Sequence, residues 1–395
     1  MIERYDAIVV GGGPSGATAA EDLARGGART LLLDRAGRIK PCGGAIPPRL
    51  IKDFDIPLDM LVSRATSARM VGPSQRTVDM PIDGGFVGMV DRGPFDEWLR
   101  ARAERTGAMR ATGLFEQVRS LDDGGAVVSW REGRGGPLRS AQTRVVIGAD
   151  GARSAVATQA LPDVPQTPCV FAYHEMVRSP ADHPAEGGPF NQSRCDIYYQ
   201  GNLSPDFYAW IFPHGDVTSV GVGSANKGFS LKGAVGALRA TTGLDECETV
   251  RSEGAPIPLK PLKRWDNGRN TVLAGDAAGV VAPASGEGIY YAMLGGRLAA
   301  EAGLTFLKTG NAKALGQARK KFMSEHGKVF WMLGMMQHFW YSSDRRRERF
   351  VHLCEDKDIQ HLTWQAYMHK KLVRAKPMAH ARIFCKDMAH LLGSR

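Results

Sequence analysis

The 395-residue sequence predicts an α/β protein that combines a dinucleotide-binding domain, an inserted antiparallel-sheet domain and a helical C-terminal region. Three observations predict this fold class. The chain opens on a glycine-rich strand–turn–helix–strand unit, two more strand–glycine segments follow at residues 144–157 and 270–302, and an alternating aromatic run at 205–213 lies between them. The length is sufficient for two or three domains or for one interrupted domain.

The opening unit, YDAIVVGGGPSGATAAEDLARGGARTLLLDR, predicts a dinucleotide site. Residues 8–10 form a continuous apolar run of the kind found in buried parallel strands. Gly11, Gly13 and Gly16 then allow a tight turn, close approach of the backbone to a pyrophosphate and close helix packing, as in Rossmann-type folds. Asp34 ends the second strand 18 residues after Gly16, where it can hydrogen-bond a ribose hydroxyl. The residues expected to contact the dinucleotide are Gly11, Gly13, Pro14, Ser15, Gly16, Asp34 and Arg35.

Two later segments favour FAD as the dinucleotide. RVVIGADGARSAVA leads from an apolar strand to Asp150, and NTVLAGDAAG leads from another strand to Asp276, ahead of a helix that starts after the letters GEG. Asp276 can accept hydrogen bonds from a ribityl chain, and the helix would direct its N-terminus at the flavin ring carbonyls. Each turn alone is compatible with an ordinary βα connection, but three in this order indicate one cofactor. These segments add to the expected site Asp150, Gly275, Asp276, Gly286, Gly288 and Ile289.

Composition narrows the class of protein. No apolar run reaches the roughly 18 residues of a membrane-spanning helix, and the N-terminus enters a strand without a basic leader or cleavage site. We therefore expect a protein on the cytosolic side of the membrane. The cysteines contain no CxxC pair, so neither a metal site nor a disulfide framework is expected. They are Cys42, Cys169, Cys195, Cys247, Cys354 and Cys385.

The net charge of +10 comes from the C-terminal region, where residues 310–395 hold 17 Lys/Arg and 7 Asp/Glu. This region is poor in glycine and rich in helix formers, so it is expected to be helical. Within it, KKFMSEHGKVFWMLGMMQHFWYSSDRRRERF mixes methionines and aromatics with Arg345, Arg346, Arg347 and Arg349. One interpretation is an interfacial element that meets anionic headgroups, and the other is a core-packing helix with a solvated basic end. Nucleic-acid binding is not expected, because no recognisable motif accompanies the charge.

Taken together, these motifs resemble the flavoprotein group typified by para-hydroxybenzoate hydroxylase. The resemblance rests on GGGPSG, Arg92-x-x-Phe95-Asp96, the ADG segment and LAGDAAG followed by GEG. It implies that Arg92 contacts FAD and that the substrate domain is inserted between pieces of the FAD domain. The expected FAD segments are 1–70, 92–165 and 265–305, the substrate segments are 71–91 and 166–264, and the helical region is 306–395.

Within that group, two stretches resemble the geranylgeranyl reductase family. These are KPCGGAIPP, with Cys42, Gly43 and Gly44, and SPDFYAWIFPHGD, which fits the family pattern PxxYxWxFP. PCGGAIP, DFDIP and SGEGIYYA are most similar to the (bacterio)chlorophyll geranylgeranyl reductases, which reduce the pigment tail to phytyl. The resemblance implies a geranylgeranyl diphosphate or pigment substrate and NADPH as donor, with membrane attachment expected at a photosynthetic membrane. It adds Cys42, Gly43, Gly44 and Arg92 to the cofactor site.

The aromatic run predicts a hairpin with a substrate-facing side. A period of two places Tyr208, Trp210 and Phe212 on one face of a strand, with Phe207, Ala209 and Ile211 on the other, and VTSVGVGSA reads as the return strand. The aromatic face can line a slot for an isoprenoid chain, or it can simply pack in a sheet core. With the PxxYxWxFP match, the substrate-binding prediction is Tyr208, Trp210, Phe212 and Pro213.

The chemistry assigns three catalytic residues. An isolated trisubstituted alkene has no carbonyl to polarise it, so the expected route protonates the less substituted carbon while hydride reaches the tertiary carbon. The faces of Tyr208 and Trp210 can stabilise a cation-like carbon, and Cys42 can give or relay the proton because a thiol keeps its proton at neutral pH. The alternative for Cys42 is an inert thiol that fills a turn.

Two rival functions share the fold. One is a flavin monooxygenase of an aromatic or prenylated substrate, and the other is a non-catalytic flavin-bearing escort protein for pigment or lipid. No second GxGxxG unit follows a strand, so NADPH would dock transiently, and a reduced ferredoxin is the alternative donor. The sequence leaves open the substrate headgroup, the number of double bonds reduced and the oligomeric state.

Overall fold

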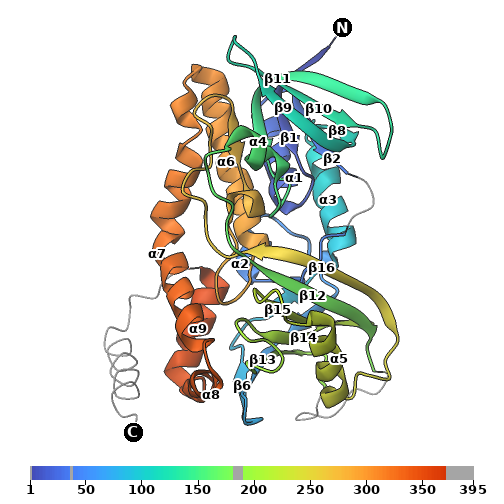
Figure 1. The fold of residues 1–395 in the computed structure, drawn as a ribbon, viewed down its shortest axis with the longest axis vertical. Coiled ribbons are helices and arrows are strands. Elements are labelled where there is room, and N and C mark those ends of the chain that lie inside the picture. Colours follow the sequence, from blue (N-terminus) through green and yellow to red (C-terminus); the bar gives the residue numbers. More distant parts are fainter. Residues whose placement is uncertain (1, 36–38, 181–189, 371–395) are drawn as a thin grey trace.

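The computed structural model describes residues 2–35, 39–180 and 190–370, so that Cys385 and the end of the helical region lie outside it. Figure 1 shows one sheet with its helices in the upper part of the molecule and a second sheet in the lower part, while a long helix, α7, runs beside them. The predicted combination of an α/β domain, a second sheet and C-terminal helices is confirmed, although the second sheet is antiparallel in all but one of its strand pairs.

The first sheet holds the dinucleotide-binding unit. It is seven-stranded, in the order β8-β2-β1-β11-β10-β9, with β17 paired to β11. β8, β2, β1, β11 and β17 run parallel, whereas β9 and β10 form an antiparallel extension. Its strands are β1 (Glu3–Val10), β2 (Thr30–Asp34), β8 (Met109–Thr112), β9 (Leu114–Ser120), β10 (Ala126–Arg131), β11 (Leu138–Gly148) and β17 (Thr271–Leu273).

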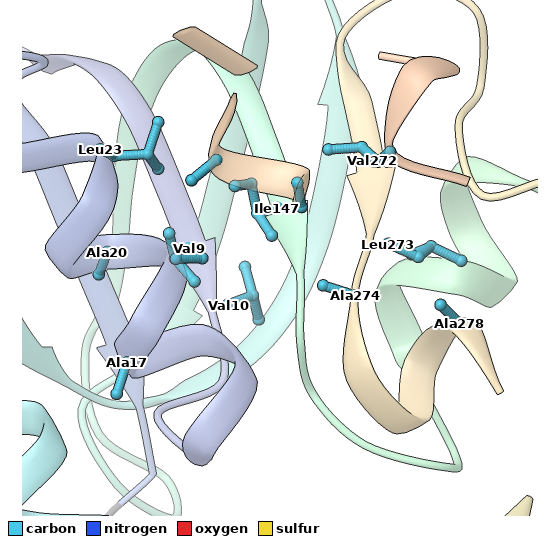
Figure 2. Close-up of a cluster of buried hydrophobic side chains, with 14 of the residues drawn as sticks. Val9, Val10, Ala17, Ala20, Leu23, Ile147, Val272, Leu273, Ala274 and Ala278 are labelled. Carbon is cyan, nitrogen blue, oxygen red and sulfur yellow. The ribbon is translucent and has the colours of Figure 1, made fainter. Parts of the chain in front are cut away.

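Helices cover this sheet because its central strands are apolar on both faces. Figure 2 shows buried side chains of one hydrophobic cluster on neighbouring elements, with Ala17 and Ala20 of α1, Val9 of β1, Ile147 of β11 and Val272 of β17. Alanines on α1 let the helix approach the sheet closely, and Leu23 fills the space at its end. The helices of this half are α1 (Pro14–Arg25), α3 (Arg92–Arg105), α4 (Ala155–Ala160), α6 (Ile289–Thr309) and the 3₁₀ helix Gly275–Ala278.

The second sheet is also seven-stranded, in the order β16-β12-β15-β14-β13-β5-β6. The expected hairpin is confirmed, since β14 pairs antiparallel with β15. β16 was not expected, because Gly254 and Pro256 interrupt its pattern, yet proline is tolerated on an edge strand. The elements are β5 (Ser67–Val71), β6 (Thr77–Pro81), β12 (Cys169–Arg178), β13 (Arg194–Tyr198), β14 (Ala209–His214), β15 (Val217–Ser224), β16 (Thr249–Pro258) and α5 (Leu231–Thr242).

A small third sheet, in the order β3-β7-β4, lies at the junction of the two halves. The two strands on either side of Asp83, Gly84 and Gly85, β6 and β7, therefore join different sheets instead of pairing with each other. This brings the loop that carries Cys42 against the second sheet. The elements here are β3 (Ala45–Ile46), β4 (Ser63–Ala65), β7 (Val87–Met89), α2 (Pro48–Asp53) and the 3₁₀ helix Leu58–Met60.

The C-terminal region is helical, as expected, with α7 (Gln317–Trp340), α8 (Asp344–Leu353) and α9 (Lys357–His369) after the 3₁₀ helix Ala312–Ala314. Arg347 was expected on a solvated or headgroup-facing basic surface, but it is only 3% exposed. Its guanidinium donates to the carbonyls of Pro205 and Tyr341. It is thus a structural residue of the core. Among the described residues, no helix has the length and apolar character needed to cross a bilayer.

Candidate functional site

The glycine turn after β1 builds an open helix N-terminus. Gly11 has φ of +105°, and a Cβ on Gly16 would lie 1.8 Å from the carbonyl oxygen of Gly11, so both positions exclude other residues. Gly13, in contrast, has open space around its Cα and caps α1 without a side-chain hydrogen bond. The first N–H groups of α1 are therefore available to an anion such as a pyrophosphate.

A cavity of about 710 Å³ extends from this turn along the first sheet. Most of the predicted cofactor residues line it, whereas Gly16 lies behind the turn and Gly275 packs against Ser15. The lining includes Gly11, Gly13, Pro14, Ser15, Asp34, Arg35, Arg92, Asp150 and Asp276. An elongated cavity with an open helix N-terminus and a carboxylate at the end of β2 fits a dinucleotide.

The carboxylates of this cavity differ in their partners. Asp34 lies beside Gly12 and receives a hydrogen bond from Arg100 at 3.4 Å. Asp150 accepts hydrogen bonds from the backbone N–H groups of Ala155 at 2.7 Å and Val156 at 3.1 Å, and so anchors the start of α4. Burial raises the pKa of Asp150, and these hydrogen bonds oppose the shift. Arg100 was not anticipated from the sequence.

Arg92 lies at the inner end of the large cavity. It is 4% exposed and forms a bidentate pair with Asp96, with N–O distances of 2.9 and 2.7 Å. Burial alone would lower the pKa of Arg92, but Asp96 and the nearby Cys42 outweigh burial and raise it. The guanidinium is therefore a fixed positive charge beside the Cys42 sulfur.

A second cavity, of about 280 Å³, meets the first where Arg92, Asp276 and Lys40 line both. Lys40 forms an ion pair with Asp276 at this junction. Sequence reasoning missed Lys40, because it precedes the cysteine loop in the chain and is separated from Asp276 by 236 residues. The predicted residues that line the second cavity are Cys42, Gly43, Gly44, Tyr208, Trp210, Phe212, Gly286, Gly288 and Ile289.

The walls of the second cavity are mainly apolar and aromatic. The face of β14 supplies Trp210 and Phe212, while β5, β6, β13 and α9 supply further side chains that sequence reasoning did not assign to a site. Pro213 points to the opposite face of β14 and does not line the cavity, which corrects its predicted substrate role. The additional wall residues include Met70, Met80, Cys195, Ile197, Tyr199, Phe207, Trp364 and Tyr367.

The cysteine loop lies directly on this aromatic face. A Cβ on Gly43 would be 2.9 Å from the Phe212 ring, and one on Gly44 would be 2.5 Å from Nε2 of His214. Gly44 also has φ of +69°, which disfavours a side chain. The two sequence motifs, CGG and PxxYxWxFP, are therefore one structural unit. Cys42 is half-buried at its centre, and its Sγ accepts a hydrogen bond from the Gly44 N–H at 3.4 Å.

Tyr208 is held in place by its hydroxyl group, which donates to the Ser285 carbonyl at 2.6 Å. Burial raises the pKa of Tyr208, so the phenol stays neutral and presents its ring to the cavity. Phe207 stacks on it, with ring centroids 4.2 Å apart. The prediction that Phe207 and Tyr208 face opposite sides of a strand is wrong. β14 begins only at Ala209, so these two side chains lie before the part of the strand in which side chains alternate.

The helix α9 closes the far wall, and a buried ion pair ties it to the GEG turn. Glu287 pairs with Lys370, which also lies 4.3 Å from the Tyr367 ring. Burial raises the pKa of Glu287, and Lys370 opposes this shift. The sequence offered no signal for this contact. Among the described residues, no cluster of His, Cys, Asp or Glu side chains has the arrangement of metal ligands.

Comparisons with known proteins agree with this geometry. Residues 9–60 match the family described as an NAD(P)-binding Rossmann-like domain. The chain is 56% identical over 392 residues to the geranylgeranyl diphosphate reductase of Rhodobacter capsulatus, covering 99% of this chain and 98% of that protein.

Solved structures share the fold. A geranylgeranyl bacteriochlorophyll reductase-like protein from Thermoplasma acidophilum superposes with a TM-score of 0.80 at 21% identity, over 95% of this chain and 99% of that one. The p-nitrophenol 4-monooxygenase of Pseudomonas putida superposes with a TM-score of 0.72 at 16% identity, over 93% of this chain and 98% of that one. The predicted hydroxylase-like fold is thus confirmed.

Proposed function

Because the chain belongs to the geranylgeranyl diphosphate reductase family, we propose that it binds FAD in the large cavity and hydrogenates double bonds of a geranylgeranyl chain in the second cavity. The observation that carries the proposal is the junction of the two cavities. An apolar, aromatic slot opens onto the dinucleotide cavity beside a cysteine and a buried arginine. A two-electron donor and a hydrophobic chain can meet there.

The chain's own residues fit the cofactor. The N-terminus of α1 would hold the pyrophosphate, and Asp34 would bind a ribose hydroxyl. Asp276 lies at the junction, where a ribityl chain would pass, and Gly288 leaves the N-terminus of α6 without a side-chain cap. FAD, once reduced, supplies the hydride. NADPH is the proposed donor to the cofactor, docking transiently, with a reduced ferredoxin as the alternative.

In this mechanism Cys42 gives its proton to the less substituted carbon of the double bond. Arg92 lies next to the sulfur and stabilises the thiolate that remains. Tyr208 and Trp210 present ring faces to the tertiary carbon, and an aromatic face stabilises a nearby positive charge. The slot excludes water from that carbon, because its walls are mainly apolar.

Anaerobic turnover tests the function directly. The protein is incubated without oxygen with NADPH and either geranylgeranyl diphosphate or geranylgeranylated (bacterio)chlorophyll, and products are analysed by mass. Gains of two hydrogens per reduced bond support the proposal and identify the headgroup. Oxygen uptake that matches product formation would indicate the monooxygenase instead, and a reduced flavin that neither substrate reoxidises would indicate the escort protein.

A Cys42→Ala variant tests the proton donor. It should retain FAD and lose at least a hundredfold in turnover, because general acid catalysis contributes about that much. Cys247→Ala is the matched control, since Cys247 is also a half-buried free thiol but packs in the cluster near α5, away from both cavities. Full turnover of Cys42→Ala would remove Cys42 from the mechanism.

The membrane attachment proposed for this protein involves α7. Trp331 and Met335 are 66% and 50% exposed and are one helical turn apart. Arg346, whose guanidinium lies 4.4 Å from the Phe339 ring, and the exposed Arg345 supply positive charge near the end of the same helix. Apolar side chains flanked by arginines suit the cytoplasmic face of a photosynthetic membrane.

Liposome flotation tests this attachment. The protein should float with anionic vesicles at low salt, and Trp331→Ala with Met335→Ala should weaken binding severalfold. Vesicles of neutral lipid are the control. Absence of binding to anionic vesicles would exclude the membrane role while leaving the reductase activity untouched.

A further inference from the structure

A small cavity beside Cys42 adjoins the substrate slot. Its volume is about 10 Å³, close to the smallest space that holds one water molecule. Cys42, His174 and Arg92 line both this cavity and the substrate slot, whereas His214, Arg251 and Glu253 line the small cavity alone. No local sequence pattern predicts this cluster, which β12, β14 and β16 bring together.

His174 is 3% exposed and has a partner at each ring nitrogen. Its Nδ1 lies 2.9 Å from Ser219 Oγ, and its Nε2 lies 3.2 Å from Glu253 Oε2. The indole N–H of Trp210 donates to the same Ser219 Oγ at 3.1 Å. An indole nitrogen can only donate, so the Ser219 hydrogen can point to Nδ1 of His174. The hydrogen of the neutral imidazole then lies on Nε2, directed at Glu253.

Glu253 connects this histidine to the surface. Its side chain is 18% exposed on the edge strand β16, and its other oxygen lies 3.3 Å from Arg251. Arg251 is 30% exposed and pairs with Asp91 at 3.1 Å. A proton can therefore travel from solvent to the small cavity without entering the apolar slot.

The other groups that face the small cavity do not carry this proton. Arg92 and Arg251 carry guanidinium groups, which keep their protons, and Lys40 is held in its ion pair with Asp276. Burial lowers the pKa of His214 to about 4, and its Nδ1–H donates to the Phe212 carbonyl at 2.9 Å. The exchangeable groups are thus Cys42, His174 and Glu253, with Asp91 held by Arg251 at the outer end.

We propose that Glu253 and His174 return the proton to Cys42 after each reduction, through one water molecule in the small cavity. This inference rests on the proposed role of Cys42. When the thiol gives its proton to the alkene carbon, its S–H bond breaks and one C–H bond forms, while hydride forms the second. In this step His174 is the imidazolium, whose Nδ1–H donates to Ser219 Oγ. It passes its Nε2 hydrogen to Glu253, Glu253 passes a proton to the water, and the water protonates the thiolate. Solvent then reprotonates the pair.

His174→Gln and Glu253→Gln test the path. Glutamine is similar in size and still forms hydrogen bonds, but its amide cannot act as an acid or a base at neutral pH. Stopped-flow measurement should show normal reduction of the flavin by NADPH and an unchanged KM for geranylgeranyl diphosphate. Steady-state turnover should fall at least tenfold, with a larger solvent isotope effect and a lost limb in the pH profile. Glu253→Asp should restore part of the rate. Glu248→Gln, an exposed carboxylate paired with Arg178, is the matched control.

A second readout does not depend on turnover. In the protein without substrate, imidazole nitrogen NMR should show a changed Nε2 signal of His174 in Glu253→Gln, because the carboxylate that accepts the Nε2 hydrogen is lost. Wild-type rates and pH profiles in both glutamine variants would overturn the path while the reductase function stands. Failure of the wild type to reduce any geranylgeranyl substrate would overturn the function and the path together.

Discussion

The two halves of the molecule build their cavities in different ways. The dinucleotide cavity depends on a turn in which Gly11 and Gly16, five residues apart in the chain, approach each other closely. The substrate slot is assembled from the cysteine loop, strands β5, β6, β13 and β14 of the second sheet, and α9, which lie far apart in the chain. The first site is formed by the backbone of one short segment, whereas the second is formed by tertiary packing of distant segments. Substitutions should therefore separate cofactor binding from substrate chemistry.

The largest effect is expected from Gly16→Ala in the cofactor half. A Cβ would lie 1.8 Å from the Gly11 carbonyl oxygen, and the backbone there cannot give way without breaking the turn. We expect the loss of bound FAD and a destabilisation above about 4 kcal/mol, measured by flavin absorbance and urea denaturation. Gly236→Ala in α5, where a Cβ meets nothing within 4 Å, is the control and should stabilise slightly. A Gly16→Ala protein that keeps its flavin would contradict the claim that this turn determines cofactor binding.

In the substrate half, the corresponding substitution is Gly44→Ala. The new Cβ would lie 2.5 Å from both His214 Nε2 and the Val90 carbonyl oxygen, at φ of +69°. We expect about 2–3 kcal/mol of destabilisation and at least tenfold slower turnover, with FAD retained. Slow turnover with FAD retained would show that substrate chemistry can be impaired without affecting cofactor binding. Loss of both FAD and turnover would show that the two cavities cannot be separated by substitution.

Acid should weaken the substrate half through His214. Since burial lowers its pKa to about 4, the unfolded state binds more protons than the folded state between about pH 6.5 and 4. Stability is therefore fully present above pH 6.5 and is lost as the pH falls towards 4, by on the order of 3 kcal/mol. His214→Asn should flatten that slope in urea denaturation measured at pH 7 and pH 4.5. An unchanged slope would mean that another group dominates.

The smallest effect is expected at the far wall of the slot. Trp364 of α9 lines the cavity, and Trp364→Ala removes apolar surface that would contact the substrate chain. We expect KM to rise about tenfold, from roughly 1.5 kcal/mol of lost burial, with little change in turnover at saturation. Steady-state kinetics with geranylgeranyl diphosphate measures this. A fall in turnover without a change in KM would place Trp364 outside the chain-binding surface.

The sequence predicted most of the first half because its constraints are local. The GxGxxG turn, the acid after β2 and the GD turn each follow from a few consecutive residues and a known strand–helix order. The β14–β15 hairpin was also predictable, since a period of two is visible over six residues.

The contacts that were not predicted join distant segments. Lys40 meets Asp276 across 236 residues, and His174 meets Glu253 across two strands that pair only in the folded sheet. Neither residue carries a local pattern, because an ion pair needs only proximity. Pro213 was wrongly assigned to the slot because a motif fixes residue types and not the face on which each side chain lies.

The parallel pairing of β17 with β11 has a bearing on how the protein is made. β11 is complete at Gly148, but its partner β17, from Thr271 to Leu273, is made only when two thirds of the chain has been translated. At about 5–20 residues per second, β11 waits for on the order of 10 s with that edge uncovered. Asp276 of the cofactor cavity follows β17 in the chain, so we expect flavin to be captured late in translation and chains stalled before residue 271 to be colourless.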